Sequence, residues 1–251
     1  EALLGVPVLP PREERALQMI ARTMGHPLSQ LYVRDHFDDS TRDKATEMIG
    51  LVKAAFEARM PTRAWLSDPT RETAMEKLSR LTYRVGYPDD WIDYSAVQVG
   101  ADPVANLGAL AAFGNARMRA RFGGPVQLDP FSDIHTLPVT VNAAYDPSQN
   151  GFEIPAAILQ PPMFDPDMDA AVNFCRLGAV IGHEMTHGFD TSGRRFDPQG
   201  NLRDWWTPAD STAFEAEAAK LIEQADAWQV LPDLKGNGAL EVTENMADVG
   251  G

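Results

Sequence analysis

Two histidines separated by four positions, His183 and His187, enclose a glutamate in the stretch His183-Glu-Met-Thr-His187. If this stretch is helical, residues four apart lie on one face about 6 Å apart along the axis, so both imidazoles can reach one metal ion. Glu184 then projects beside the ion, where it can act as a base toward a water molecule. This spacing favours a zinc site over the alternative, two surface histidines on a solvated helix.

A third zinc ligand is required because two imidazoles hold zinc poorly, and catalytic sites of this type commonly combine two histidines with a glutamate. The stretch Glu244-Asn-Met-Ala-Asp248 offers a candidate. On a helix, Glu244 and Asp248 share a face, so Glu244 can bind zinc while Asp248 accepts a hydrogen bond from an imidazole, for which we favour His183. An acidic pair at this spacing also occurs on solvated helix faces, but the presence of the His183 and His187 motif in the same chain favours the metal site.

Helices must carry these side chains, and apolar residues recurring at three- and four-residue steps predict several. We expect helices over residues 45–56, 68–85, 103–122, about 167–189, and from 207 onward, with Asp68 as a cap and Gly86 as a stop signal. Alternating apolar and polar residues over 138–145 predict a strand. Turn-forming residues at 146–151 then allow residues 152–154 to return antiparallel as a hairpin.

Composition narrows the class of protein. The 251 residues include 22 Lys and Arg against 36 Asp and Glu, and the formal net charge of −14 argues against nucleic acid as a partner. Hydrophobic residues make up 44% and charged residues 23%, as in ordinary globular proteins. The single cysteine, Cys175, excludes an intrachain disulfide. We find no apolar run near the roughly 20 residues of a membrane span and no signal peptide at residues 1–4.

Several further stretches resemble the neprilysin family of zinc metallopeptidases. The resemblance rests on residues 180–190, 204–206, 244–251, 141–143 and 158–162, with weaker matches at 31–33 and 86–90. It implies a mainly α fold with a small β-sheet (α+β), in which an α-helical domain closes over a thermolysin-like zinc catalytic domain. We therefore assign residues 1–100 to part of the helical, lid-like domain and residues 101–251 to the catalytic domain, truncated at its C-terminal end.

The resemblance also implies roles for individual residues. One zinc ion would be bound by His183, His187 and Glu244, with Glu184 as general base and Asp248 supporting a ligand. Asp190 would order the zinc helix or the turn after it, with no catalytic part assigned.

Substrate contacts follow from the same resemblance. Asn142 and Ala143 would bind the peptide backbone, which agrees with an exposed edge strand. Ile158, Met163 and Val180 would line the pocket for the residue after the scissile bond. An apolar pocket there implies cleavage on the amino side of bulky hydrophobic residues.

The chain departs from the family in three respects. Ala144 stands where a second aromatic residue is usual, and Ala179 where the side chain is often larger, so both alter the pocket. The family's transition-state histidine and substrate-binding arginine lie further downstream than Gly251. We therefore expect this chain to associate with N- and C-terminal segments of the same polypeptide, and the resemblance favours an extracytoplasmic location.

The expected function is that of a zinc-dependent metalloendopeptidase, a hydrolase acting on oligopeptides. The alternative is a non-catalytic, zinc-containing peptide-binding protein, against which the intact Glu184 argues. A third hypothesis is a zinc-stabilised helical interaction module.

Overall fold

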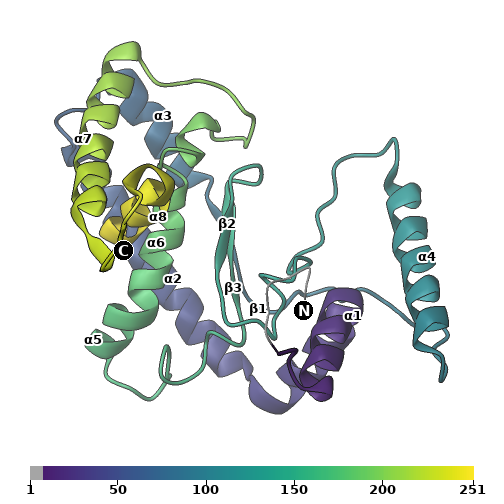
Figure 1. Cartoon of the computed structure of the whole chain (residues 1–251). Coiled ribbons are helices and arrows are strands. Elements are labelled where there is room, and N and C mark those ends of the chain that lie inside the picture. The colour runs from purple at the N-terminus through teal and green to yellow at the C-terminus, as the bar shows by residue number, and fades with distance from the viewer. Residues whose placement is uncertain (1–7) are drawn as a thin grey trace.

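A computed structural model describes residues 8–251, so residues 1–4 and the first part of the segment 1–100 lie outside the described residues. Helices dominate this part of the chain, and two small β-sheets accompany them (Figure 1). The helices are α1 (Arg12–His36), α2 (Asp39–Arg59), α3 (Asp68–Ser79), α4 (Pro103–Arg121), α5 (Ala170–Asn173), α6 (Ala179–His187), α7 (Pro208–Ala227) and α8 (Gly238–Gly250). The strands are β1 (Thr82–Gly86), β2 (Ala144–Asp146), β3 (Gly151–Pro155), β4 (Gln229–Leu231) and β5 (Leu234–Lys235).

The larger sheet has the order β1-β3-β2, with β1 parallel and β2 antiparallel to the central β3. The predicted hairpin is present as β2 and β3, and β2 forms an edge of the sheet. The predicted strand over 138–145 is largely wrong, because only its last two residues belong to β2. Before them, the Thr140 amide donates to the Leu137 carbonyl and the Asn142 amide to the Thr140 carbonyl, which makes turns rather than a ladder.

Residues 82–86, expected as the end of a helix, form β1 instead. The preceding helix α3 ends at Ser79, and its cap is Ser67 rather than Asp68. Parallel pairing with β3 satisfies the backbone of residues 82–86 and buries Val85 in the core. Periodicity could not reveal this, because the partner strand lies about 70 residues further along the chain.

The helix α6, which carries the two histidines, is fixed by its buried face. Ile181 and Met185 are fully buried in the main core, which also contains side chains of α2, α3, β1 and β3. At about 100° per residue, positions 183 and 187 lie on the opposite side from positions 181 and 185. Packing of α6 on the sheet and α2 therefore turns both histidines away from the core. Residues 170–187 form a continuous helical run, as predicted, through a wider π-type turn at Phe174–Gly178.

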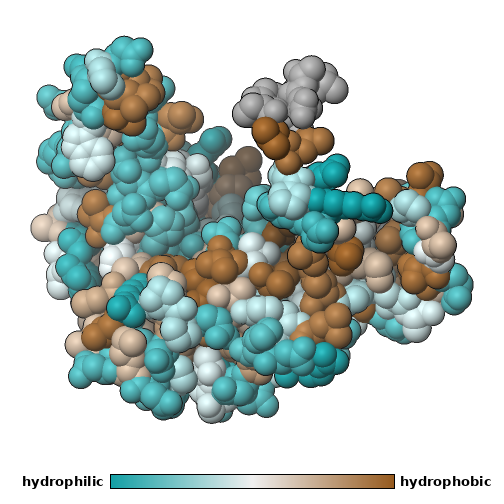
Figure 2. Space-filling view, turned by 60° about the horizontal axis from the view of Figure 1, so that its bottom comes forward, coloured by the Kyte–Doolittle hydropathy of each residue, from teal (hydrophilic) through white to brown (hydrophobic). Residues whose placement is uncertain are grey.

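The helix α4 projects at the right of Figure 1 and contacts α1. It begins with Pro103 after the cap Asp102, as predicted. Its apolar side chains are largely exposed, with Val104, Met118 and Phe122 70% or more accessible, and Figure 2 shows apolar groups on this projecting arm. The helix therefore buries little more than Leu110 among residues 8–251. No helix in this described part of the chain is both long and apolar enough to cross a membrane.

A buried carboxylate ties the start of α3 to the start of α7. Asp210 accepts hydrogen bonds from the Ser67 amide (2.8 Å), the Thr207 hydroxyl (2.6 Å) and the hydroxyls of Ser67 and Thr70. Burial by itself raises the pKa of Asp210, but the hydrogen bonds from Ser67, Thr207 and Thr70 outweigh it and hold the pKa well below its usual range. The charged carboxylate is thus the form that joins the two helices.

We expect Asp210→Ala to destabilise the intact polypeptide by about 2–4 kcal/mol, because several buried donors lose their acceptor at once. Thermal or denaturant unfolding measures this directly. Glu217→Ala removes an exposed carboxylate of α7 that forms a surface ion pair with Lys220, and should change stability by less than about 0.5 kcal/mol. Equal effects of the two substitutions would contradict the linking role of Asp210.

The same carboxylate predicts a pH dependence. Because its pKa is lowered in the folded protein, its stabilisation is complete above the unfolded value of about 4 and is lost as pH falls further toward the folded value. The difference in unfolding free energy between the protein and Asp210→Asn should therefore be constant from about pH 5 to 8 and shrink below about pH 4. A difference that grows on acidification would show the opposite sign of the pKa shift.

Candidate metal centre

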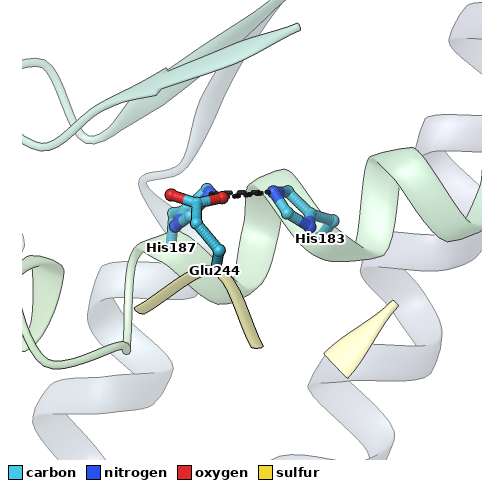
Figure 3. Close-up of side chains that lie close together, drawn as sticks. All are labelled: His183, His187 and Glu244. Carbon is cyan, nitrogen blue, oxygen red and sulfur yellow. Dashed lines mark hydrogen bonds and ion pairs between the residues drawn. The ribbon is translucent and has the colours of Figure 1, made fainter. Parts of the chain in front are cut away.

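Three side chains from two helices converge at the surface of α6. His183 and His187 project from α6, and Glu244 reaches toward them from α8 (Figure 3). The two Nε2 atoms lie 3.0 Å apart, and Oε2 of Glu244 lies 3.4 Å from that of His183 and 3.6 Å from that of His187. These three residues are the only metal-ligand cluster of its kind within residues 8–251.

The spacing of these donor atoms fits a zinc ion. Zinc bonds to nitrogen and oxygen of about 2.0–2.2 Å in a tetrahedron place neighbouring ligand atoms about 3.3–3.6 Å apart. The distances of 3.0, 3.4 and 3.6 Å are close to that edge length. Two imidazoles and one carboxylate also form the donor set that catalytic zinc sites use, with one tetrahedral position left open.

Each imidazole is held through its second ring nitrogen by a carboxylate. Nδ1 of His183 lies 2.8 Å from Oδ1 of Asp248, and Nδ1 of His187 lies 2.7 Å from Oδ2 of Asp190. A proton on each Nδ1 leaves the Nε2 lone pair free to bind a metal. Burial lowers the pKa of His187, but the Asp190 hydrogen bond and nearby carboxylates outweigh it and raise the pKa. Asp248 thus contacts the histidine for which the sequence favoured it.

Close packing of α6 on α8 brings Glu244 within reach. A Cβ atom on Gly250 would clash with the Thr186 side chain, so the absence of a side chain at position 250 allows the approach. Thr243, next to Glu244, shares a 2.7 Å hydroxyl hydrogen bond with Thr191 in the loop that follows α6. These contacts fix the position of Glu244 along α6 relative to the two histidines.

Glu184 lies beside the three donor atoms and is 5% exposed. Its Oε2 atom is buried without a hydrogen-bond partner among residues 8–251. Burial raises the pKa of Glu184 to about 7, with the charges of His187 and His183 opposing the shift. A carboxyl group whose pKa lies near neutrality can both accept and release a proton at physiological pH.

A cavity of about 420 Å³ is lined by the three donor residues and by Glu184. Asn142 and Ala143 line it from the segment just before the edge strand β2, so these two predicted substrate-binding residues face the metal centre. Ile158, Met163 and Val180 do not line this cavity; they are buried or partly buried against the main core. Their predicted place in a specificity pocket stays a prediction.

Two contacts near the centre were not specified from the sequence. Asp190, expected only to order the zinc helix or the turn after it, holds His187, and its spacing of three residues from that histidine was the signal that could have revealed this contact. Tyr145 packs near the end of α6, and its hydroxyl donates to Oδ1 of Asn150 (2.9 Å). No sequence signal points to this contact, because it depends on how the hairpin meets α6.

Comparison with known proteins gives a consistent result. Models of peptidase family M13 match residues 1–88 and residues 142–251. The chain is 35% identical to Neprilysin-1 of Caenorhabditis elegans over 253 residues, covering 96% of this chain and 33% of that protein. It is 31% identical to Neutral endopeptidase of Lactobacillus helveticus over 258 residues, covering 100% of this chain and 39% of that protein.

Among solved structures, the chain is similar to the Mycobacterium tuberculosis zinc metalloprotease ZMP1 in complex with an inhibitor. The TM-score is 0.88 at 37% identity, over 99% of this chain and 38% of that chain. The mainly α fold with a small sheet, in a thermolysin-like arrangement, is thereby confirmed. The chain spans about a third of the length of the proteins it matches, and the assignment of residues 1–100 and 101–251 to two domains stays a prediction.

We expect His183→Ala and Glu244→Ala each to lower the zinc content of the intact polypeptide well below that of the unmodified protein, because each removes one of three donor atoms. Elemental analysis after dialysis measures the zinc-to-protein ratio. Glu223→Ala removes an exposed carboxylate from α7 and should leave the ratio unchanged. An unchanged ratio in either ligand variant would exclude that residue as a ligand.

Proposed function

We propose, since the chain belongs to peptidase family M13, that the intact polypeptide is a zinc-dependent endopeptidase that hydrolyses oligopeptides at the His183, His187 and Glu244 centre. The observation that carries the proposal is that the donor set of His183, His187 and Glu244 shares a cavity with Glu184, whose buried Oε2 atom has no partner among residues 8–251. The enzyme names of the relatives support the same reaction class.

The proposed chemistry divides between the metal and the protein. Zinc in such a site supplies a Lewis acid that lowers the pKa of water and polarises a carbonyl group. Glu184 removes a proton from the attacking water and delivers it to the amine that leaves, for which its buried carboxylate with a free Oε2 atom is suited. Asp248 and Asp190 keep the two imidazoles oriented. One zinc ion suffices for this set of ligands.

Substrate binding is proposed along the edge strand β2. An extended peptide can pair with an exposed strand edge through main-chain hydrogen bonds. Asn142 and Ala143 precede β2 and line the cavity that holds the three donor residues, so a peptide that follows this edge would pass the centre. We assign to Ile158, Met163 and Val180 the walls of the pocket for the residue after the scissile bond, which gives cleavage on the amino side of bulky hydrophobic residues.

Membership of the family supports three further proposals. Peptides are the proposed substrates, further segments of the same polypeptide complete the active site, and the protein acts outside the cytoplasm. The alternative is a zinc-containing peptide-binding protein without turnover. It does not account for Glu184, because burying a carboxylate costs free energy and peptide binding alone does not need a base beside the metal site.

We expect Glu184→Gln to abolish peptide cleavage while zinc content stays at the level of the unmodified protein, because the amide keeps the shape but cannot accept the proton. Mass-spectrometric mapping of products from a mixed oligopeptide pool, incubated with the intact polypeptide, measures both activity and specificity. New N-termini at Leu, Phe or Met should appear only with the unmodified protein.

Two results of this experiment would count against the proposal. Full activity in zinc-loaded Glu184→Gln would remove Glu184 from the role of base. No cleavage by the unmodified, zinc-loaded polypeptide would favour the peptide-binding alternative.

A further inference from the structure

Asp190, the partner of His187, is itself a buried charge. It is 2% exposed, and its Oδ2 atom lies 2.7 Å from Nδ1 of His187. The other oxygen, Oδ1, accepts hydrogen bonds from the amides of Ser192 and Gly193, both at 2.7 Å. The direction of the His187 ring therefore depends on where the loop after α6 holds these two amides.

The Gly193 peptide is fixed from its other side by Lys77 of α3. Nζ of Lys77 donates to the Gly193 carbonyl at 2.8 Å and to the Phe196 carbonyl at 2.7 Å. A Cβ atom on Gly193 would clash with the His187 carbonyl, so this residue lies directly against the end of α6. One residue thus links three groups: its amide binds Asp190, its carbonyl binds Lys77, and its backbone contacts His187.

Lys77 is also a buried positive charge near Asp190. It is 1% exposed, and its ammonium nitrogen lies 5.8 Å from the centroid of the Phe189 ring. Burial lowers the pKa of Lys77 to about 8, against the attraction of Asp190 and Asp197. A buried carboxylate such as Asp190 is stabilised by a cation held nearby in the same low-dielectric surroundings.

The position of Lys77 is in turn constrained. Nδ2 of Asn150, which is buried, donates to the Lys77 carbonyl at 2.8 Å. Leu78, the next residue, is fully buried in the main core. The ammonium group is therefore presented to the loop from a rigid helix rather than from a mobile surface side chain.

We propose that Lys77 is a positioning residue for the metal centre: by fixing the Gly193 peptide and balancing the charge of Asp190, it orients His187 for zinc binding. The inference rests on the proposed function only in taking His187 as a zinc ligand. It gives the buried amine of an N-terminal helix a role at a site built by α6 and α8, although Lys77 contacts neither the metal ligands nor a substrate.

A double-substitution cycle on the intact polypeptide tests this inference. Zinc affinity is measured by competition with a chelator for the unmodified protein, Lys77→Met, Asp190→Asn and the double variant. We expect Asp190→Asn to weaken zinc binding about 10- to 100-fold, as for other partners of ligating histidines, and Lys77→Met about 3- to 10-fold. In the Asp190→Asn background, Lys77→Met should add less than about twofold, because it acts through Asp190.

Two control variants separate positioning from general stability. Asp210→Asn weakens another buried polar contact of α3 and should lower the melting temperature without a comparable loss of zinc affinity. Lys220→Met removes an exposed lysine and should change neither. The absorption spectrum of the cobalt-substituted protein should shift in Lys77→Met and not in Asp210→Asn, because only the former alters the ligand geometry.

Several outcomes would overturn the inference. They are wild-type zinc affinity in folded Lys77→Met, additive effects in the cycle, or an equal loss of affinity in Asp210→Asn. If Lys77→Met does not fold, the cycle is run with Lys77→Gln, which keeps a polar end in the buried site. Failure of both to fold would show a purely structural role. The readout is zinc affinity, so this inference and the proposed function can fail separately. If the effects of Lys77→Met and Asp190→Asn on zinc affinity are non-additive but the protein cleaves no peptide, this inference stands and the proposed function fails. If the protein cleaves peptides but the two effects are additive, the proposed function stands and this inference fails.

Discussion

The close crossing of α6 and α8 sets where the three metal-binding side chains can lie. Two histidines on one helix define only a line of possible metal positions, and a third donor must come from a separate element. Gly250 lets the backbones approach, and Glu244 then reaches both Nε2 atoms at 3.4 and 3.6 Å. The same approach brings Asp248 of α8 to Nδ1 of His183.

Buried charges in this protein fall into two kinds that differ in how fully they are satisfied. Asp210 and Asp190 each accept several hydrogen bonds, which lowers the cost of burying a carboxylate and fixes the elements that donate. Glu184 is different, since its Oε2 atom has no partner among residues 8–251 and its pKa rises to about 7. A carboxyl group with a free oxygen and a raised pKa, in a cavity beside a candidate metal site, is suited to accept and release a proton.

Helices α2 and α3 support the candidate metal centre by packing in the core behind α6. Side chains of α2 and α3 bury the face of α6 opposite the histidines, while β1 completes the sheet beside β3. The free edge of that sheet is left at β2, next to the cavity. Parts of the region assigned to the helical, lid-like domain thus pack in the same core as the helix that carries the two histidines, and α4 projects to one side of the molecule beside α1 (Figure 1).

Local patterns in the sequence determined the helix that carries His183 and His187, the pairing of Glu244 with Asp248 on one face, and the hairpin of β2 and β3. Each of these depends on spacing within about ten residues, which side-chain types and helical periodicity encode directly. Tertiary structure decided the strand at residues 82–86 and the place of Lys77 against the loop after α6. A strand forms where a partner is available, and a buried charge is tolerated where distant groups neutralise it, so neither can be read from neighbouring residues alone.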